Sequence, residues 1–263
     1  MKQLLTLGMV AALLAFACAA HAYPNLSGST GYIQAPTASV IAPGSFGIAA
    51  DYVGSKDDNN NQKDSYPIRL QYGVMNALEV GFGYDGNAFD GKSLWNINAK
   101  YKLPYEFSGI QTAVGASYGQ TPTLPDWGGK ELKATQLYVA GTDKFNVGIP
   151  LGVTLGVNWT QLQNVNKNSG WRIQLGADAE VYKNTWILAD LQSIAKMGDM
   201  TGHMTGQKNL WSLGARYAFT QDLSAEAGVT NGMYIGETKK ANFFVGVDYV
   251  FGLVEQNEKS AKK

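Results

Sequence analysis

The last apolar stretch of the chain reads Phe243-Phe244-Val245-Gly246-Val247-Asp248-Tyr249-Val250-Phe251. Successive side chains of a β-strand point to opposite faces of the sheet, so this stretch has two different faces. One face carries only aromatic and aliphatic side chains, whereas the other includes Gly246 and Asp248. An antiparallel strand with an apolar outer face, a more polar inner face and aromatic ends is typical of a transmembrane β-barrel.

The same alternation recurs from Ser45 onward in about twelve segments that turn signals separate. The clearest hairpin pairs Tyr66–Val74 with Leu78–Tyr84 through a turn at Met75-Asn76. Alternation is weakest in two of the remaining segments, those that begin at Leu137 and Trp186. The other expected strands are Phe46–Val53, Trp95–Leu103, Ile110–Tyr118, Leu137–Thr142, Leu151–Thr160, Trp171–Tyr182, Trp186–Ser193, Trp211–Phe219, Leu223–Thr230 and Phe243–Phe251.

Long and short connections alternate between these segments. Outer-membrane barrels have short periplasmic turns and longer external loops, whereas a soluble β-sandwich has no reason to sort loop length by side. We therefore expect an all-β, antiparallel transmembrane barrel of about twelve strands with both termini in the periplasm. The long connections are Gly54–Ser65, Gly86–Lys92, Gln120–Lys133, Gln161–Gly170, Ile194–Lys208 and Asn231–Lys239; the short ones are Met75-Asn76, Pro104–Ser108, Asp143–Pro150, Lys183-Asn184 and Thr220–Asp222.

The N-terminus has the pattern of a secretory signal peptide. Lys2 precedes an apolar run from Leu4 to Ala20, and Ala20-His21-Ala22 forms a small-residue cleavage site. Lipidation at Cys18 is the alternative, but the residues before it lack the usual aliphatic side chain. We expect a signal peptide at 1–22, an N-terminal coil at 23–44, a barrel at 45–251 and a charged periplasmic tail at 252–263.

Composition agrees with a barrel and excludes some partners. The chain has 31 glycines, 14 tyrosines and 6 tryptophans, and only 16% of its residues are charged, which suits many strands with aromatic girdles. Its net charge is zero, so no basic surface for nucleic acid is expected. The expected partners are outer-membrane lipid, the barrel-assembly machinery through the C-terminal strand, and a polysaccharide or small polar solute.

The expected inner face of the barrel is polar and of mixed charge. Its charged residues either pair across strands to support a narrow barrel, or line a conduit that orients a polar solute. These residues carry both signs, so they do not indicate a lumen that selects ions of one charge. A hairpin that turns through Thr220–Asp222 should set Arg216 opposite Glu226 on the inner face, and on another strand Leu155 should face outward and Thr154 inward. The expected lumen-lining residues are Asp51, Arg69, Glu79, Lys100, Lys102, Arg172, Asp178, Glu180, Asp190, Arg216, Glu226 and Asp248.

Residues 23–44 are expected to form a shaped coil, because glycines and prolines interrupt any regular element there. We expect this coil to cap the periplasmic mouth, in which case its deletion would leave conductance unchanged. A plug folded into the lumen is the alternative, with Gly31, Tyr32, Pro36 and Thr37 at its centre. A barrel of about twelve strands has room for such a segment.

Two resemblances support the assignment to the outer membrane. The Gly246-x-x-Tyr249-x-Phe251 spacing resembles the C-terminal targeting signal of bacterial outer-membrane proteins. The run Gly31-Tyr32-Ile33-Gln34-Ala35-Pro36-Thr37-Ala38, followed by Pro43-Gly44-Ser45-Phe46, resembles the opening of the YjbH-like outer-membrane proteins linked to exopolysaccharide production, and the hairpin from Arg69 to Gly81 is similar to theirs. This resemblance implies an outer-membrane barrel that acts with envelope polysaccharide, and it implies no catalytic residues.

Catalytic and metal sites find little support in the sequence. After signal removal His203 is the only histidine, and no nucleophile-elbow motif accompanies it, although Ser193 and Ser212 lie on flanking strands. Met197, Met200, His203 and Met204 could supply soft ligands to copper, but methionines in a loop more simply fill irregular space. We expect no enzyme and no cofactor.

The function expected from the sequence is a narrow or gated passive conduit for a small polar solute or saccharide. A structural or interaction barrel linked to exopolysaccharide production or export is the alternative.

The mature protein should begin at Tyr23 and fractionate with outer membranes, because the cleavage site and the terminal aromatic strand both direct it there. Intact-mass measurement of the purified protein tests the first residue. An acylated product that begins at Cys18 would contradict this prediction.

Overall fold

The computed structural model describes residues 23–26, 28–56, 62–89, 92–124, 130–163, 168–193, 209–231 and 241–252. Within these ranges no helix is long and apolar enough to cross a membrane. The described strands are β1 (Phe46–Lys56), β2 (Gln62–Ser65), β3 (Pro67–Met75), β4 (Leu78–Phe89), β5 (Lys92–Phe107), β6 (Ile110–Leu124), β7 (Lys130–Asn146), β8 (Pro150–Gln163), β9 (Asn168–Tyr182), β10 (Thr185–Ser193), β11 (Asn209–Ala218), β12 (Leu223–Thr230) and β13 (Asn242–Phe251).

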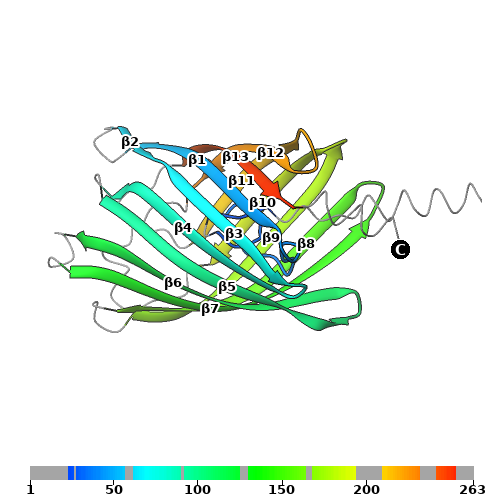
Figure 1. Ribbon diagram of the computed structural model, residues 1–263, viewed down its shortest axis with the longest axis horizontal. Coiled ribbons are helices and arrows are strands. Elements are labelled where there is room, and N and C mark those ends of the chain that lie inside the picture. Colours follow the sequence, from blue (N-terminus) through cyan, green and yellow to red (C-terminus); the bar gives the residue numbers. More distant parts are fainter. Residues whose placement is uncertain are drawn as a thin grey trace, which may run out of the picture.

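All these strands belong to one antiparallel sheet that closes on itself (Figure 1). Neighbours along the chain pair in order, and β1 pairs with β13 from Phe46 opposite Phe251 to Gly54 opposite Phe243. The short strand β2 continues the line of β3 beyond Tyr66 and pairs with the end of β1. The barrel wall therefore has twelve strands, β1 and β3 to β13, as the sequence predicts.

The two ends of the barrel differ in their connections. At one end, named here the turn end, the strands join through residues 76–77, 108–109, 147–149, 183–184 and 219–222. Ser108 and Gly109 both have positive φ angles, 51° and 86°, which is the conformation of a two-residue turn that matches the twist of its strands. The first residue of β1 and the last of β13 also lie at the turn end. The opposite end is the loop end.

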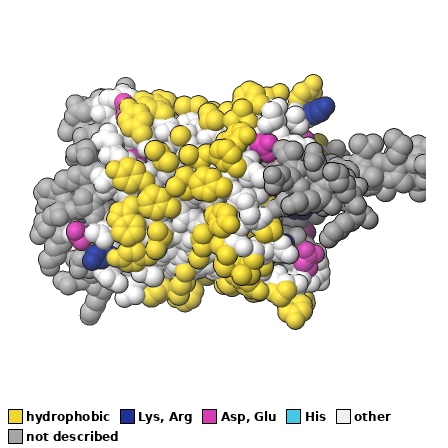
Figure 2. Space-filling model, viewed as in Figure 1, with side chains coloured by type: hydrophobic (Ala, Val, Ile, Leu, Met, Phe, Trp, Pro, Cys, Tyr) yellow, Lys and Arg dark blue, Asp and Glu magenta, His cyan; other side chains and the backbone are white. Residues whose placement is uncertain are grey.

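Side chains alternate between the two faces of the wall as the sequence predicts. Along β13 the apolar residues at odd positions from Phe243 to Phe251 are exposed, and the even positions are buried. On β8, Leu155 is 56% exposed and its neighbour Thr154 is fully buried. The outward side chains form an apolar band around the middle of the barrel, with charged side chains near its two ends (Figure 2). This band has the character of a lipid-facing surface.

Several strands are longer than expected, which corrects parts of the connections. The expected loop Gly86–Lys92 is mostly strand, because β4 runs to Phe89 and β5 starts at Lys92. Much of the expected loop Gln120–Lys133 likewise lies in β6 and β7. Beyond the apolar band both faces of a strand are polar, so alternation disappears from the sequence although the backbone pairing continues.

The described residues 23–26 and 28–44, named here the inner segment, lie inside the barrel (Figure 1). Tyr32, Ile33 and Ala35 form an apolar cluster with three inward-facing wall residues, Val53, Leu188 and Phe244. A second cluster joins Tyr23 and Ile41 to Val250 of β13. The inner segment thus covers apolar side chains that would otherwise face a polar lumen, and it does not rest across a mouth of the barrel.

Leu155→Arg should prevent stable insertion, whereas Gln161→Arg on the same outer face of β8 should be tolerated. A cation at the bilayer midplane costs about 2–4 kcal/mol, and the cost falls to about 0–1 kcal/mol near the interface. The folded fraction after refolding into lipid vesicles, measured by heat-modifiable electrophoretic mobility, tests this. Equal folding of the two variants would contradict the placement of Leu155 in the membrane.

An inward arginine on β8 is not a suitable control, although the sequence indicates a polar lumen that would accept one. The hydroxyl oxygen of Thr154 lies 3.1 Å from that of Tyr32 and 2.7 Å from that of Thr142. Thr154→Arg would therefore collide with the inner segment.

Candidate functional site

The centre of the inner segment is a compact loop. Tyr32 donates its backbone N–H to Ala35 over 3.0 Å, and Thr37 donates to the carbonyl of Thr30 over 3.1 Å. A side chain on Gly31 would overlap the carbonyl oxygen of Ala35, so this position requires glycine. The sequence run from Gly31 to Ala38 therefore encodes a tight turn that exposes backbone N–H groups to the barrel wall.

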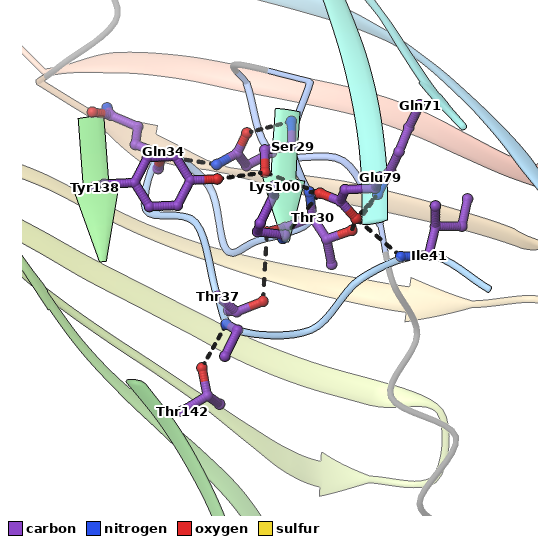
Figure 3. Close-up of polar contacts among 12 residues, drawn as sticks. Ser29, Thr30, Gln34, Thr37, Ile41, Gln71, Glu79, Lys100, Tyr138 and Thr142 are labelled. Carbon is purple, nitrogen blue, oxygen red and sulfur yellow. Dashed lines mark hydrogen bonds and ion pairs between the residues drawn. The ribbon is translucent and has the colours of Figure 1, made fainter. Parts of the chain in front are cut away.

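The carboxylate of Glu79, on the inner face of β4, anchors two distant parts of the inner segment (Figure 3). Ser29 donates its hydroxyl over 3.0 Å, and Thr30 donates its N–H over 2.8 Å and its hydroxyl over 2.6 Å. Ile41, eleven residues further along, donates its N–H over 2.9 Å. Glu79 has no exposed surface, so these bonds are shielded from water.

Lys100 of β5 balances the charge of Glu79. Its ammonium nitrogen lies 3.0 Å from Oε1 of Glu79 and donates to the backbone carbonyl of Thr30 over 2.8 Å. Gln71 of β3 donates to Oε2 of Glu79 over 3.1 Å, and the hydroxyl of Tyr138 lies 3.3 Å from that of Ser29. Two of the expected lumen-lining residues, Glu79 and Lys100, therefore form one buried pair that holds the inner segment.

A second carboxylate holds the far side of the loop. Oδ2 of Asp190, on β10, accepts the backbone N–H groups of Ile33 over 3.1 Å and Gln34 over 2.8 Å. Thr142 of β7 accepts the N–H of Ala38 over 2.8 Å. The inner segment is thus fixed to opposite walls of the barrel through its backbone donors.

Glycines on the wall make room for the inner segment. A side chain on Gly81 of β4 would overlap the carbonyl oxygen of Gly28, and one on Gly176 of β9 would overlap the ring of Tyr32. At Gly83, two positions along β4, the nearest atoms all belong to the side chain of Asn96. The inner face of the wall is therefore shaped to the backbone of this segment at Gly81 but not at Gly83.

A buried charge cluster crosses the seam between β1 and β13. Arg69 pairs with Asp51, with Glu226 at 3.2 Å and with Asp248 at 3.6 Å, and Arg216 pairs with Glu226 at 2.7 Å. These five residues lie on five adjacent strands, β3, β1, β13, β12 and β11. The predicted neighbours Arg216 and Glu226 stand directly opposite one another, so that prediction is confirmed.

The start of the inner segment rests on this seam cluster. Arg69 donates to the backbone carbonyl of Pro24, and the guanidinium of Arg216 lies 4.8 Å from the ring centre of Tyr23. Burial raises the pKa of Tyr23 to about 12, and burial also raises the pKa of Tyr32 above its ordinary value. Both phenols therefore stay protonated and neutral inside the barrel at physiological pH.

The other expected lumen residues are spread along the wall. Arg172 lies on the wall towards the loop end, and Glu180 accepts the N–H of Asn184 at a turn over 3.2 Å. Asp178 lies against Gly152 of the neighbouring strand and is hydrogen-bonded to Tyr32 of the inner segment. Lys102 is partly exposed next to an irregularity of β5.

The structure adds no support for the candidate catalytic and metal-binding residues of the sequence. Met197, Met200, His203 and Met204 lie outside the described residues. Ser212 bonds to the hydroxyl of Thr230 at 3.0 Å inside the barrel, and Ser193 bonds to the backbone of Ile173. The described residues contain no group of three or more potential His, Cys, Asp or Glu metal ligands.

Sequence reasoning missed a set of uncharged side chains at the loop end. A cavity of about 290 Å³, named here the loop-end cavity, lies between the inner segment and this end of the wall. Besides residues of the inner segment, its lining residues come from the loop-end halves of β3 to β7 and β9 to β11, which places the cavity at this end. The alternation of side chains along each strand could have identified the wall residues of this set, because they share the inner face with the charged residues. Its carboxamides are Gln34, Asn96, Asn98, Gln136, Gln174 and Gln192.

Solved porins have a similar fold. The KdgM porin in complex with disordered oligogalacturonate aligns with a TM-score of 0.57 and 15% identity, over 78% of this chain and 99% of that chain. The NanC porin aligns with a TM-score of 0.51 and 11% identity, over 78% and 98%. No protein-family model matches the chain, and no curated protein matches it in sequence. The chain therefore shares with these porins the fold of a closed antiparallel β-barrel, and it has an apolar outer band.

Glu79→Gln should loosen the inner segment, because it leaves Lys100 buried without its carboxylate and replaces an acceptor oxygen by a donor. Removal of one partner of a buried ion pair costs about 3–5 kcal/mol. Ala35 has no exposed surface, and the chain from Tyr23 onward has no cysteine, so Ala35→Cys provides a single reporter thiol. Its labelling by a maleimide should accelerate at least about tenfold in the Glu79→Gln background.

The matched control is Glu180→Gln in the same Ala35→Cys background. Glu180 is also a wall carboxylate, but its described partner is the turn residue Asn184. Labelling should stay at the starting rate. Equal labelling rates in the two glutamine variants would show that Glu79 does not hold the segment.

Proposed function

We propose that this protein is a gated passive conduit for a small polar solute or saccharide, closed by its own inner segment and without enzymatic chemistry. The observation that carries the proposal is the way in which the segment is held. Besides two small apolar clusters, hydrogen bonds from backbone and hydroxyl groups to Glu79, Asp190 and Thr142 hold it to the wall. Such bonds exchange readily for bonds to water, so the segment can leave the lumen without unfolding the wall.

The charge cluster at the seam supports this division between a stable wall and a movable segment. Its ion pairs join wall strands to one another, whereas the inner segment contributes only a carbonyl and an aromatic ring to it. A wall held by its own pairing and ion pairs would survive displacement of residues 23–44. We also propose that the turn end, where both barrel termini lie, faces the periplasm, as in other outer-membrane barrels.

The closed interior equally favours a second candidate, a structural or interaction barrel in which the segment never leaves. In that case the buried side chains of the segment serve only to fill the lumen. Conductance separates the two candidates, because a permanently filled barrel carries no steady current.

Deletion of Leu26–Ala42 should convert a protein of low or intermittent conductance into one with a steady and several-fold larger single-channel conductance. The deletion removes the side chains that fill the centre of a twelve-stranded wall. Recording from refolded protein in planar bilayers tests this. Unchanged conductance in a deletion variant that folds would contradict the gated conduit.

A point substitution keeps this proposal testable if the deletion fails to fold. Gly81→Ala should displace the inner segment, because the added methyl group overlaps the carbonyl oxygen of Gly28. Gly83→Ala is the matched control, since its methyl group meets a flexible side chain. Open events should become more frequent in Gly81→Ala alone. The same channel behaviour in both variants would favour the structural barrel.

A further inference from the structure

The loop-end cavity has a floor and walls of different origin. Leu26, Ser29, Gln34 and Pro36 of the inner segment form the floor. The walls come from β3 to β7 and β9 to β11, and the carboxamides of the walls lie on β5, β7, β9 and β10, which carry no residue of the seam cluster. A solute that enters from the loop end would therefore meet this cavity before it meets the closed centre.

The chemistry of the cavity is dominated by carboxamides. Asn96, Asn98, Gln136, Gln174 and Gln192 face it from the walls, and Gln34 faces it from the floor. A carboxamide both donates and accepts hydrogen bonds, and so does an alcohol. Ser117 adds a hydroxyl to the same lining, and Ser29 and Tyr138 also line the cavity, with their hydroxyls 3.3 Å from one another. The cavity is thus complementary to a solute that carries many hydroxyl groups.

Charge in the cavity is balanced. Of its described lining residues, the charged ones are Asp85 and Arg172, one of each sign. Asp85 is already engaged by the hydroxyl of Ser65 and by the N–H of Asn87 at 3.1 Å. Since the negative charge of Asp85 offsets the positive charge of Arg172, the lining offers an anionic solute no net opposite charge for the hydration that it loses, whereas a neutral solute would keep its hydrogen bonds.

From this lining we infer that the loop-end cavity is a binding site for a neutral, hydroxyl-rich solute of the size of a small saccharide. Its volume of about 290 Å³ lies at the lower bound of about 300–1,000 Å³ that is usual for ligand sites, which suits a short sugar rather than a polymer. The inference rests on the proposed conduit, for which it names the class of solute and the place where that solute first binds. Neutral sugars, rather than acidic ones, are the ligands that the amide lining selects.

Titration calorimetry on the refolded mature protein tests this site directly. Maltose, a neutral disaccharide, serves as the probe, and digalacturonate, an acidic disaccharide of similar size, serves as the comparison. Maltose should bind saturably to one site, and digalacturonate should bind at least about tenfold more weakly. The absence of saturable maltose binding, or equal or tighter binding of digalacturonate, would overturn the inference.

Two substitutions tie the binding to this cavity. Gln136→Leu on β7 and Gln192→Leu on β10 remove amides of two separate wall strands at nearly constant volume, and each should weaken maltose binding about fivefold through the loss of hydrogen bonds. Gln161→Leu removes an outward amide of β8 and should leave the affinity unchanged. Heat-modifiable mobility verifies that all three variants fold. Equal affinities in the three variants would place the sugar elsewhere and overturn the assignment.

The outcomes separate this inference from the proposed function. Loss of maltose binding together with a conducting deletion variant would overturn the site and leave the gated conduit standing. Maltose binding that depends on Gln136 and Gln192, in a protein whose deletion variant stays closed, would establish the site and overturn the conduit.

Discussion

The buried carboxylate of Glu79 is the interaction on which the interior of this barrel depends. It accepts hydrogen bonds from Ser29, Thr30 and Ile41, and so it fixes both ends of the loop that fills the lumen. A carboxylate without exposed surface is costly unless every oxygen is satisfied, and here Lys100 and the segment satisfy it together. Glu79 and the bound segment therefore stabilise each other: the segment needs the carboxylate as its anchor, and the carboxylate needs the donors of the segment as long as water is excluded from it.

This dependence divides the interior into two regions. Arginine and acidic side chains gather across the β1–β13 seam, where they tie adjacent wall strands together and hold the start of the segment. Uncharged amides gather on other wall strands, β5, β7, β9 and β10, and face the loop-end cavity. The bound segment separates the loop-end cavity from the turn end. A barrel organised in this way can offer a neutral polar surface to a solute while ion pairs, remote from that surface, maintain the wall.

Most strands of the wall can be predicted from the sequence. Where lipid contacts one side of the wall, every second residue of a strand must be apolar, and this alternation is easy to recognise. For that reason the sequence correctly predicts that Leu155 faces outward and Thr154 inward. It also correctly predicts that Arg216 stands opposite Glu226. The ends of β4 to β7 could not be placed, because outside the membrane both faces of a strand are polar. The expected cap across the periplasmic mouth does not agree with the buried position of the inner segment, although inward apolar residues such as Phe244 and Val250 indicate a cover inside the barrel. The six carboxamides went unnoticed because uncharged polar residues are ordinary on any inner face.

The central claim is that residues 23–44 are a bound part of the interior, held by Glu79 and Asp190. Hydrogen exchange of the refolded mature protein in detergent tests it most directly, at the amides of Thr30, Ile33, Gln34 and Ile41. These amides donate to the two buried carboxylates, so they should exchange at least about a hundredfold more slowly than unprotected amides. Exchange at the rate of an unstructured peptide, with the strand amides still protected, would show an empty barrel and contradict the account.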